Sequence, residues 1–217
     1  RGLNSAQNSA TPRVNAVGNE FRALGTLVAA RRLLERAVAL DEKHLGADHP
    51  AIATSYSNLA LLLLDLGDPR GARRLLEVAV TFGERHFGRD HIVTGMRYAN
   101  LASVLRDLGE LEEAKRLLRQ AVAIHEQKFE PNHPWRATGY SNLATVLQDP
   151  GELEEAKRLL QQAVAIDEQN FEPNHQARAT HYSNLGGVLC DLGELEEAKR
   201  LLTLAVAIDE QIFEPNH

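Results

Sequence analysis

Histidine is the residue type whose spacing most suggests chemistry in this chain. Five histidines follow one another at intervals of 42 residues, namely His49, His91, His133, His175 and His217. Two imidazole nitrogens that share a zinc ion, each about 2.0–2.1 Å from the metal, lie within about 4 Å of one another. Equivalent side chains on helices packed about 8–10 Å apart cannot approach so closely. The histidines are therefore predicted to cap helices or to pack in loops, and we expect no metal site.

Nucleophiles and cofactor motifs give no sign of catalysis. The sequence has no phosphate-binding loop, dinucleotide fingerprint, HExxH, CxxC or GxSxG motif. Its one cysteine, Cys190, falls in a helical pattern and is expected to be a small core or groove residue. We expect no enzymatic activity and no cofactor. A single cysteine also rules out an internal disulfide, which fits a reducing compartment and a cytoplasmic location.

Charge and composition exclude two further classes of partner. The net charge is −6, whereas binding to nucleic acid calls for a basic stripe. The same charge disfavours an anionic membrane surface, and no run of 18 apolar residues is present to span a bilayer. Hydrophobic residues make up 43% of the chain and aromatic residues only 5%, which suits a core of leucine, alanine, valine and isoleucine.

The elements that position these residues repeat with the histidines, because glycine, alanine and asparagine recur at the same 42-residue interval. In the second repeat, apolar residues from Ile52 to Leu63 follow helical spacing. Gly67 then suits the left-handed residue after a helix, Asp68 an N-cap and Pro69 the first position of a second helix. The expected array covers 12–217, with repeats at about 12–45, 50–87, 92–129, 134–171 and 176–213. A polar linker is expected at 1–11.

Two residues break the pattern of their sister repeats. Pro150 stands where the others have leucine, as at Leu66, and it should distort the last turn of the helix before it. Gly83 lies inside a helix where sister repeats have aspartate or histidine, which costs about 1 kcal/mol relative to alanine.

The repeated residues resemble those of the tetratricopeptide repeat (TPR). The resemblance rests on the run Tyr56-Ser57-Asn58-Leu59-Ala60, on Leu66-Gly67-Asp68, and on Ala72, Leu76 and Ala79. The repeat length and the His-Pro loop are similar to those of the kinesin-light-chain type. This resemblance implies an all-α, right-handed α-solenoid of five helix-turn-helix repeats with a concave groove. The first repeat departs from it, with Ala16 in place of the asparagine and Val14 in place of the tyrosine.

The resemblance also implies that the first helix of each repeat lines the groove, with its asparagine pointing inward. These residues are Asn58, Asn100, Asn142 and Asn184. An amide can donate to and accept from a peptide backbone of any sequence, which favours contact with a ligand. The alternative is that the amides bond only to helix backbone or to each other. Further groove candidates on the same face are Leu61, Ser103, Arg106, Thr145 and Gln148.

Two hypotheses for function follow from this fold. The first is a protein–protein interaction scaffold that holds an extended peptide or a partner helix in the groove. The second is a sensor arm of a larger protein whose NTPase or protease domain lies outside these residues, since the chain lacks an initial methionine and stops within a repeated loop. The last helix is more apolar than its equivalents. Leu204, Ile208 and Ile212 are therefore expected to form an exposed strip, open to end-to-end self-association.

Overall fold

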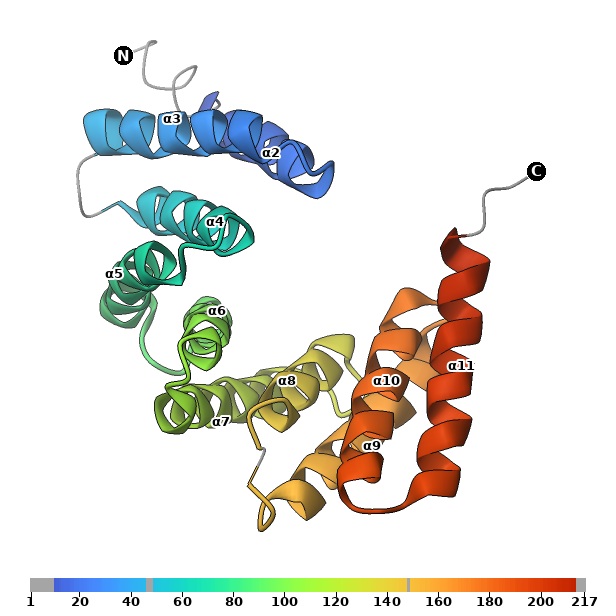
Figure 1. Ribbon diagram of the computed structural model, residues 1–217. Helices are drawn as coiled ribbons and strands as arrows, with labels where there is room; N and C mark the ends of the chain where they lie inside the picture. The colour runs from blue at the N-terminus through green and yellow to red at the C-terminus, as the bar shows by residue number, and fades with distance from the viewer. Residues whose placement is uncertain (1–9, 46–48, 148, 214–217) are drawn as a thin grey trace. The chain divides into compact units, whose positions relative to one another are not determined.

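The computed structural model describes residues 10–45, 49–147 and 149–213, and all regular structure within these ranges is α-helical (Figure 1). The helices are α2 (Ala10–Ala23), α3 (Leu27–Leu45), α4 (Pro50–Asp65), α5 (Pro69–Phe87), α6 (Ile92–Asp107), α7 (Leu111–Lys128), α8 (Pro134–Ala144), α9 (Leu153–Asn170), α10 (Gln176–Asp191) and α11 (Leu195–Phe213). The predicted all-α array of paired helices is confirmed. Helix α2 begins inside the expected linker, at Ala10, and residues 1–9 lie outside the described ranges.

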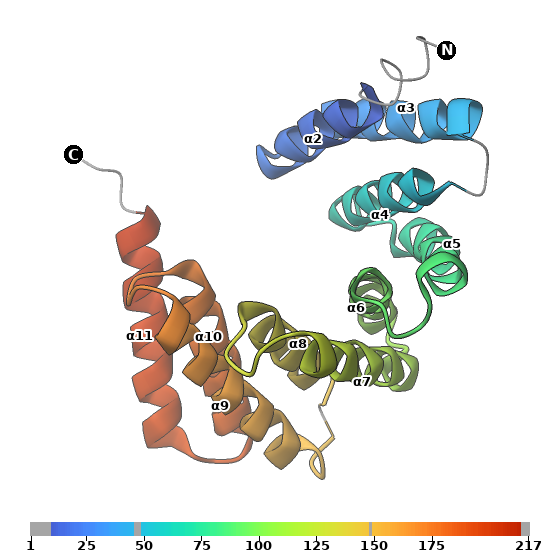
Figure 2. The ribbon, with the colours of Figure 1, turned by 180° about the vertical axis from the view of Figure 1, so that it is seen from behind.

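The chain divides into two compact units, Arg1–Ala114 (unit 1) and Lys115–His217 (unit 2). In unit 1, α2 packs on α3 and α4 on α5, and the pairs join through α3 with α4 and α5 with α6 (Figures 1 and 2). In unit 2, α8 packs on α9 and α10 on α11, and α9 joins α10. The first helices α4, α6 and α10 thus each contact the second helix of the repeat before them.

The turn between paired helices has the geometry that its residues predict. Gly67 adopts a φ of 75°, and the amide of Asp68 donates to the carbonyl of Leu63 at 2.8 Å. This is a Schellman ending, which needs a left-handed residue that glycine supplies without strain. The Asp68 carboxylate then caps α5 by accepting from the amide of Gly71 at 2.8 Å, with Pro69 in the first turn.

The fourth repeat lacks this ending because of Pro150. Helix α8 stops at Ala144, whereas its equivalents α4, α6 and α10 run on to Asp65, Asp107 and Asp191. At the position of Pro150, Leu192 donates its amide to the carbonyl of Val188 at 3.0 Å, and a proline has no amide hydrogen to donate. Gly151 does not adopt the positive φ of its sisters. The predicted distortion is confirmed, and it removes more than the last turn.

Small residues bring the paired helices together, as their repetition predicts. Ala60, Ala72 and Ala79 are each fully buried. The equivalent alanines of the second helices are also buried, at Ala30, Ala37, Ala114, Ala121, Ala156, Ala163, Ala198 and Ala205. An alanine at such a position lets two helix axes approach more closely than a larger side chain would allow.

A tyrosine–glutamate hydrogen bond joins each pair of consecutive repeats, which the sequence analysis did not anticipate. The tyrosine hydroxyl of a first helix donates to the glutamate 14 residues earlier, on the second helix of the preceding repeat. The four bonds are Tyr56 to Glu42 (2.8 Å), Tyr98 to Glu84 (2.6 Å), Tyr140 to Glu126 (2.9 Å) and Tyr182 to Glu168 (2.8 Å). Burial, together with the bond to Glu42, raises the pKa of Tyr56 to about 12.

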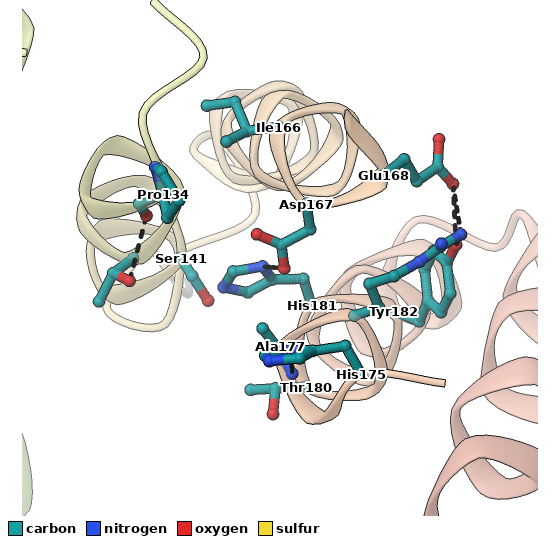
Figure 3. A network of polar contacts seen from close by, with 12 residues as sticks. Pro134, Ser141, Ile166, Asp167, Glu168, His175, Ala177, Thr180, His181 and Tyr182 are labelled. Atoms are coloured by element: carbon teal, nitrogen blue, oxygen red, sulfur yellow. Dashed lines mark hydrogen bonds and ion pairs between the residues drawn. The ribbon is translucent and has the colours of Figure 1, made fainter. Parts of the chain in front are cut away.

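A second pair with the same 14-residue separation lies in the core of each junction, and its members differ from one junction to the next. At the first junction the Ser55 hydroxyl donates to buried Asp41 at 2.6 Å and accepts from Asn15 at 2.8 Å. At the last junction Nδ1 of His181 lies 2.6 Å from the carboxylate of Asp167, and both side chains are buried (Figure 3). These two junctions are therefore held by buried polar contacts.

The two middle junctions pair a large residue with a glycine. A Cβ on Gly83 would lie 2.9 Å from the guanidinium of Arg97, and a Cβ on Gly139 would lie 2.9 Å from the ring of His125. Gly83 thus makes room for Arg97, which accounts for its presence inside a helix. His125 is buried beside Phe129 and its two ring nitrogens make no hydrogen bond. Burial lowers the pKa of His125, so the neutral imidazole is favoured.

The expected apolar strip on α11 is correct at two of its three positions. Leu204 is 39% exposed and Ile212 is 40% exposed, but Ile208 is only 7% exposed. Ile208 falls with Leu201 and Ala205 on the buried stripe of the helix, since these residues are spaced by four and three. Among the described helices, none is both long enough and apolar enough to cross a bilayer.

Candidate functional site

The repeated histidines cap helices, as predicted. Nδ1 of His91, His133 and His175 accepts a hydrogen bond from the backbone amide two residues later, at 3.2, 3.2 and 3.1 Å. Each of these rings also stacks on the phenylalanine four residues before it, at Phe87, Phe129 and Phe171. A ring that accepts at Nδ1 must carry its proton at Nε2. His217 lies outside the described residues.

Metal ligands do not gather anywhere in the part of the chain that the structure describes. No group of three or more histidine, cysteine, aspartate or glutamate side chains there could hold an ion. Cys190 is a free, exposed thiol on α10.

The repeated asparagines lie half-buried on the first helices, and they differ in their contacts. Asn184 on α10 donates to the hydroxyl of Ser141 on α8 at 2.9 Å. The side chains of Asn58, Asn100 and Asn142 make no hydrogen bond with the described part of the chain. Asn184 therefore has a structural partner, which is neither helix backbone nor another asparagine, while three amides keep donors and acceptors available to a ligand.

The other groove candidates occupy two columns of the repeat. Leu61, Ser103 and Thr145 share one position and are each partly buried, and Thr145 donates to the carbonyl of Asn142 at 2.8 Å. Arg106, in the second column, lies 3.1 Å from Asp107 in an exposed ion pair. Gln148, its counterpart in the fourth repeat, lies outside the described residues.

An aspartate recurs at residues 65, 107, 149 and 191, and it has a cation beside it in three of these four repeats. Asp65 pairs with Arg22, Asp107 with Arg106, and Asp149 with Lys115 at 3.2 Å. Asp191, at the end of α10, makes no ion pair or hydrogen bond with the described part of the chain. Its carboxylate is exposed to solvent, so this end of α10 has an uncompensated negative charge.

An open hollow of about 300 Å³ lies next to that carboxylate in unit 2. Residues from the end of α8, from α9 and from α10 line it, including Thr145, Leu147, Leu153, Asn184, Gly187 and Asp191. Thr145 and Asn184 are among the groove residues predicted from the sequence. Gly187 is not among them, although it occupies the same position of the repeat as Leu61, Ser103 and Thr145, and that position is the signal by which it could have been found.

Helix pairs that stack one on the next, as they do within each unit, define the α-solenoid class of repeat proteins. Family models described as tetratricopeptide repeat match residues 9–85, 94–169 and 178–217. The chain belongs to the tetratricopeptide repeat family. Repeats of this family generally form protein–protein interaction modules. Among curated proteins, no sequence matches the chain significantly.

Solved structures agree with this assignment. The chain is 28% identical to a putative kinesin light chain of Podosopora anserina with nearly identical TPR-like repeats, over 94% of this chain and 97% of that one, with a TM-score of 0.75. It is 19% identical to BtubC (BKLC) from P. vanneervenii, over 99% of this chain and 89% of that one, with a TM-score of 0.76, a likeness of fold alone. The predicted resemblance to kinesin-light-chain-type repeats is confirmed.

Proposed function

We propose that the chain is an interaction module whose first helices bind a partner protein through an extended segment or a helix. The observation that carries this proposal is the set of three asparagine amides, at Asn58, Asn100 and Asn142, that have no partner in the described chain. Asparagine is a mediocre helix former, so its repetition within helices calls for a reason. The exposed thiol of Cys190 suits a partner met in a reducing compartment such as the cytoplasm.

Magnitudes show what else such a groove must supply. A net hydrogen bond contributes about 0.5–1.5 kcal/mol, so the two that Asn58 and Asn100 of unit 1 can make give about 2 kcal/mol. Micromolar affinity needs about 8 kcal/mol. The remainder has to come from apolar and charged neighbours on the same helix faces, for which Leu61, Ser103 and Arg106 are the candidates in unit 1.

The amides of unit 1 provide the test. Peptides are first selected from a displayed library of random 12-residue sequences on the immobilised wild-type chain, and their affinities are then measured by fluorescence polarisation. We expect the double change Asn58→Ala and Asn100→Ala to weaken peptides that bind unit 1 about fivefold to 150-fold, because the two bonds together contribute about 1–3 kcal/mol and about 1.4 kcal/mol is tenfold. The melting temperature should stay nearly constant, since neither side chain bonds to the described chain.

Gln162→Ala is the matched control, because it removes an exposed amide from a second helix. Its affinities should equal those of the wild type. If every selected peptide binds the double variant as tightly as the wild type, the amides of unit 1 do not contact ligands.

We also propose that two copies of this chain can associate end to end through α11 and α2. Val17 and Phe21 on α2 are partly exposed, whereas their equivalents Leu185 and Leu189, on a helix packed against α9, are buried. The α2 of a second copy could thus repeat on α11 the packing of α10 on α9. The charges would also match. Exposed Arg13 on α2 occupies the repeat position of His181, and Asp209 on α11 occupies that of Asp167, so Arg13 of one copy would face Asp209 of the other as His181 faces Asp167.

Sedimentation velocity over a range of concentrations checks this association. We expect the wild-type chain to form larger species as its concentration rises, because Val17 and Phe21 present apolar surface on α2, at positions that are buried in α10. The double change Val17→Gln and Phe21→Gln, which makes this surface of α2 polar, should keep the chain monomeric. A wild-type chain that stays monomeric throughout the range would exclude the proposal.

A further inference from the structure

Two irregularities of the sequence meet at one place in unit 2. Pro150 ends α8 at Ala144, and Gly187 on α10 has no side chain where sister repeats have asparagine, leucine, serine or threonine. Both border the hollow beside Asp191: residues at the shortened end of α8 form one wall, and Gly187 is part of another. Separate changes in two repeats have thus opened the same space.

Gly187 is not explained by packing or by backbone geometry. A Cβ built on it would meet nothing within 4 Å, and its φ is not in the left-handed region. Its neighbour Gly186 is different, because a Cβ there would lie 2.7 Å from Leu202. A glycine inside a helix destabilises it relative to alanine. The effect of Gly187 that is visible in the structure is the open space itself.

The lining indicates which chemistry the hollow accepts. Leu147, Leu153 and Val188 supply apolar surface, and Thr145 and Asn184 supply polar groups. Asp191 is the one ionised side chain among the lining residues, and it makes no ion pair with the described chain, unlike Asp65, Asp107 and Asp149. The site therefore combines an apolar recess with one uncompensated negative charge.

Spacing relates these two features to an extended ligand. Gly187 and Asp191 are four residues apart on α10, and four residues of α-helix rise about 6 Å. In an extended peptide, residues i and i+2 point to the same side and lie about 6.6 Å apart. One side chain of a peptide running along α10 can therefore enter the recess while the next on the same side reaches the carboxylate.

We propose that the hollow beside Gly187 binds an aliphatic side chain of an extended peptide, and that Asp191 pairs with a lysine or arginine two residues away from it. This proposal rests on the function proposed above and names the ligand chemistry for unit 2. It assigns Gly187 and Asp191 as specificity-determining residues.

The test uses the same displayed library of random 12-residue peptides. One group of the peptides enriched on the wild-type chain should share a leucine, isoleucine or valine two residues from a lysine or arginine. Gly187→Leu, which fills the hollow, should weaken these peptides at least tenfold, and Gly187→Ala should weaken them less. Because leucine is a better helix former than glycine, Gly187→Leu should not lower the melting temperature, so the loss cannot come from unfolding.

A charge exchange tests the second contact. Asp191→Lys should weaken the same peptides at least tenfold, and a peptide whose basic residue is changed to glutamate should regain affinity for that variant. If Gly187→Leu or Asp191→Lys binds the enriched peptides as well as the wild type, the hollow is not the specificity site. The groove proposal then still stands if the asparagine variants of unit 1 weaken binding. If the wild-type chain enriches no peptide, both proposals are wrong.

Discussion

Replacing His181 with leucine should lower the free energy of unfolding of unit 2 by about 3 kcal/mol, because it leaves a buried carboxylate without a partner. Asp167 is 1% exposed, and its carboxylate lies 2.6 Å from Nδ1 of His181. Unfolding can be followed by the fluorescence of Trp135, which is the single tryptophan of the chain and lies in unit 2. Urea titrations of the wild type and the variant give the difference.

His181→Ser is the matched control, because it recreates the Asp41–Ser55 pair of the first junction. A serine hydroxyl can donate to Asp167, so this variant should lose clearly less stability than the leucine variant. The double change Asp167→Leu and His181→Leu should also recover stability, since it removes the buried charge. A leucine variant that unfolds at the wild-type urea concentration would show that the pair does not stabilise unit 2.

Changing Gly139 to arginine should cost about 3 kcal/mol by overpacking the junction of α7 and α8. Even the first carbon of the new side chain would lie 2.9 Å from Nδ1 of His125. Adding His125→Gly to this variant rebuilds the Gly83–Arg97 pair of the preceding junction and should recover at least half of the loss. Thermal unfolding should here be monitored by circular dichroism. Tryptophan fluorescence is unsuitable, because the ring of His125 contacts Trp135 and its replacement would itself change the signal.

A double-mutant cycle measures whether Gly139 and His125 are energetically coupled. Residues in contact show non-additive effects, whereas independent sites add. If the losses from Gly139→Arg and His125→Gly simply add in the double variant, the two positions are not coupled and the pairing by size is wrong. Gly187→Ala is the control for glycine replacement in an open position, and it should not destabilise the chain.

The fold could be predicted from the sequence because each helix end and each close approach has its own residue type. Gly67, Asp68 and Pro69 specify one turn, and buried alanines such as Ala79 specify the helix contact. The capping role of His133 could also be predicted, because equivalent histidines of successive repeats lie too far apart to share a metal ion. Pro150 predicted a distorted helix end, although not its extent.

The junction pairs could not be predicted, because comparing repeats aligns residues 42 apart while the contacts join residues 14 apart. Gly83 looked unfavourable when compared only with Asp41 and His125, and it makes sense only beside Arg97. Interactions of this kind depend on how two different columns of the repeat face each other in space.

The candidate site was predicted less completely than the fold. Two of the predicted groove residues, Thr145 and Asn184, line the hollow of unit 2, but the predicted residues do not share one set of contacts. Asn184 bonds to Ser141, whereas in unit 1 the corresponding Ser57 donates to the carbonyl of Ala53 and Asn100 remains without a bond. A hydroxyl that can bond either to its own helix or to a neighbour cannot be assigned from sequence.

The pairs that hold the junctions differ from one junction to the next, and this difference limits which repeats can be deleted from the gene. Genes with near-identical repeats lose whole copies when those copies recombine out of register. Loss of 42–83 would set Asp41 opposite Arg97, two opposite charges. Loss of 84–125 would set Gly83 opposite Gly139 and leave a void, and loss of 126–167 would crowd His125 against His181. Protein stability would thus remove two of these three deletions from a population and help to maintain the number of repeats.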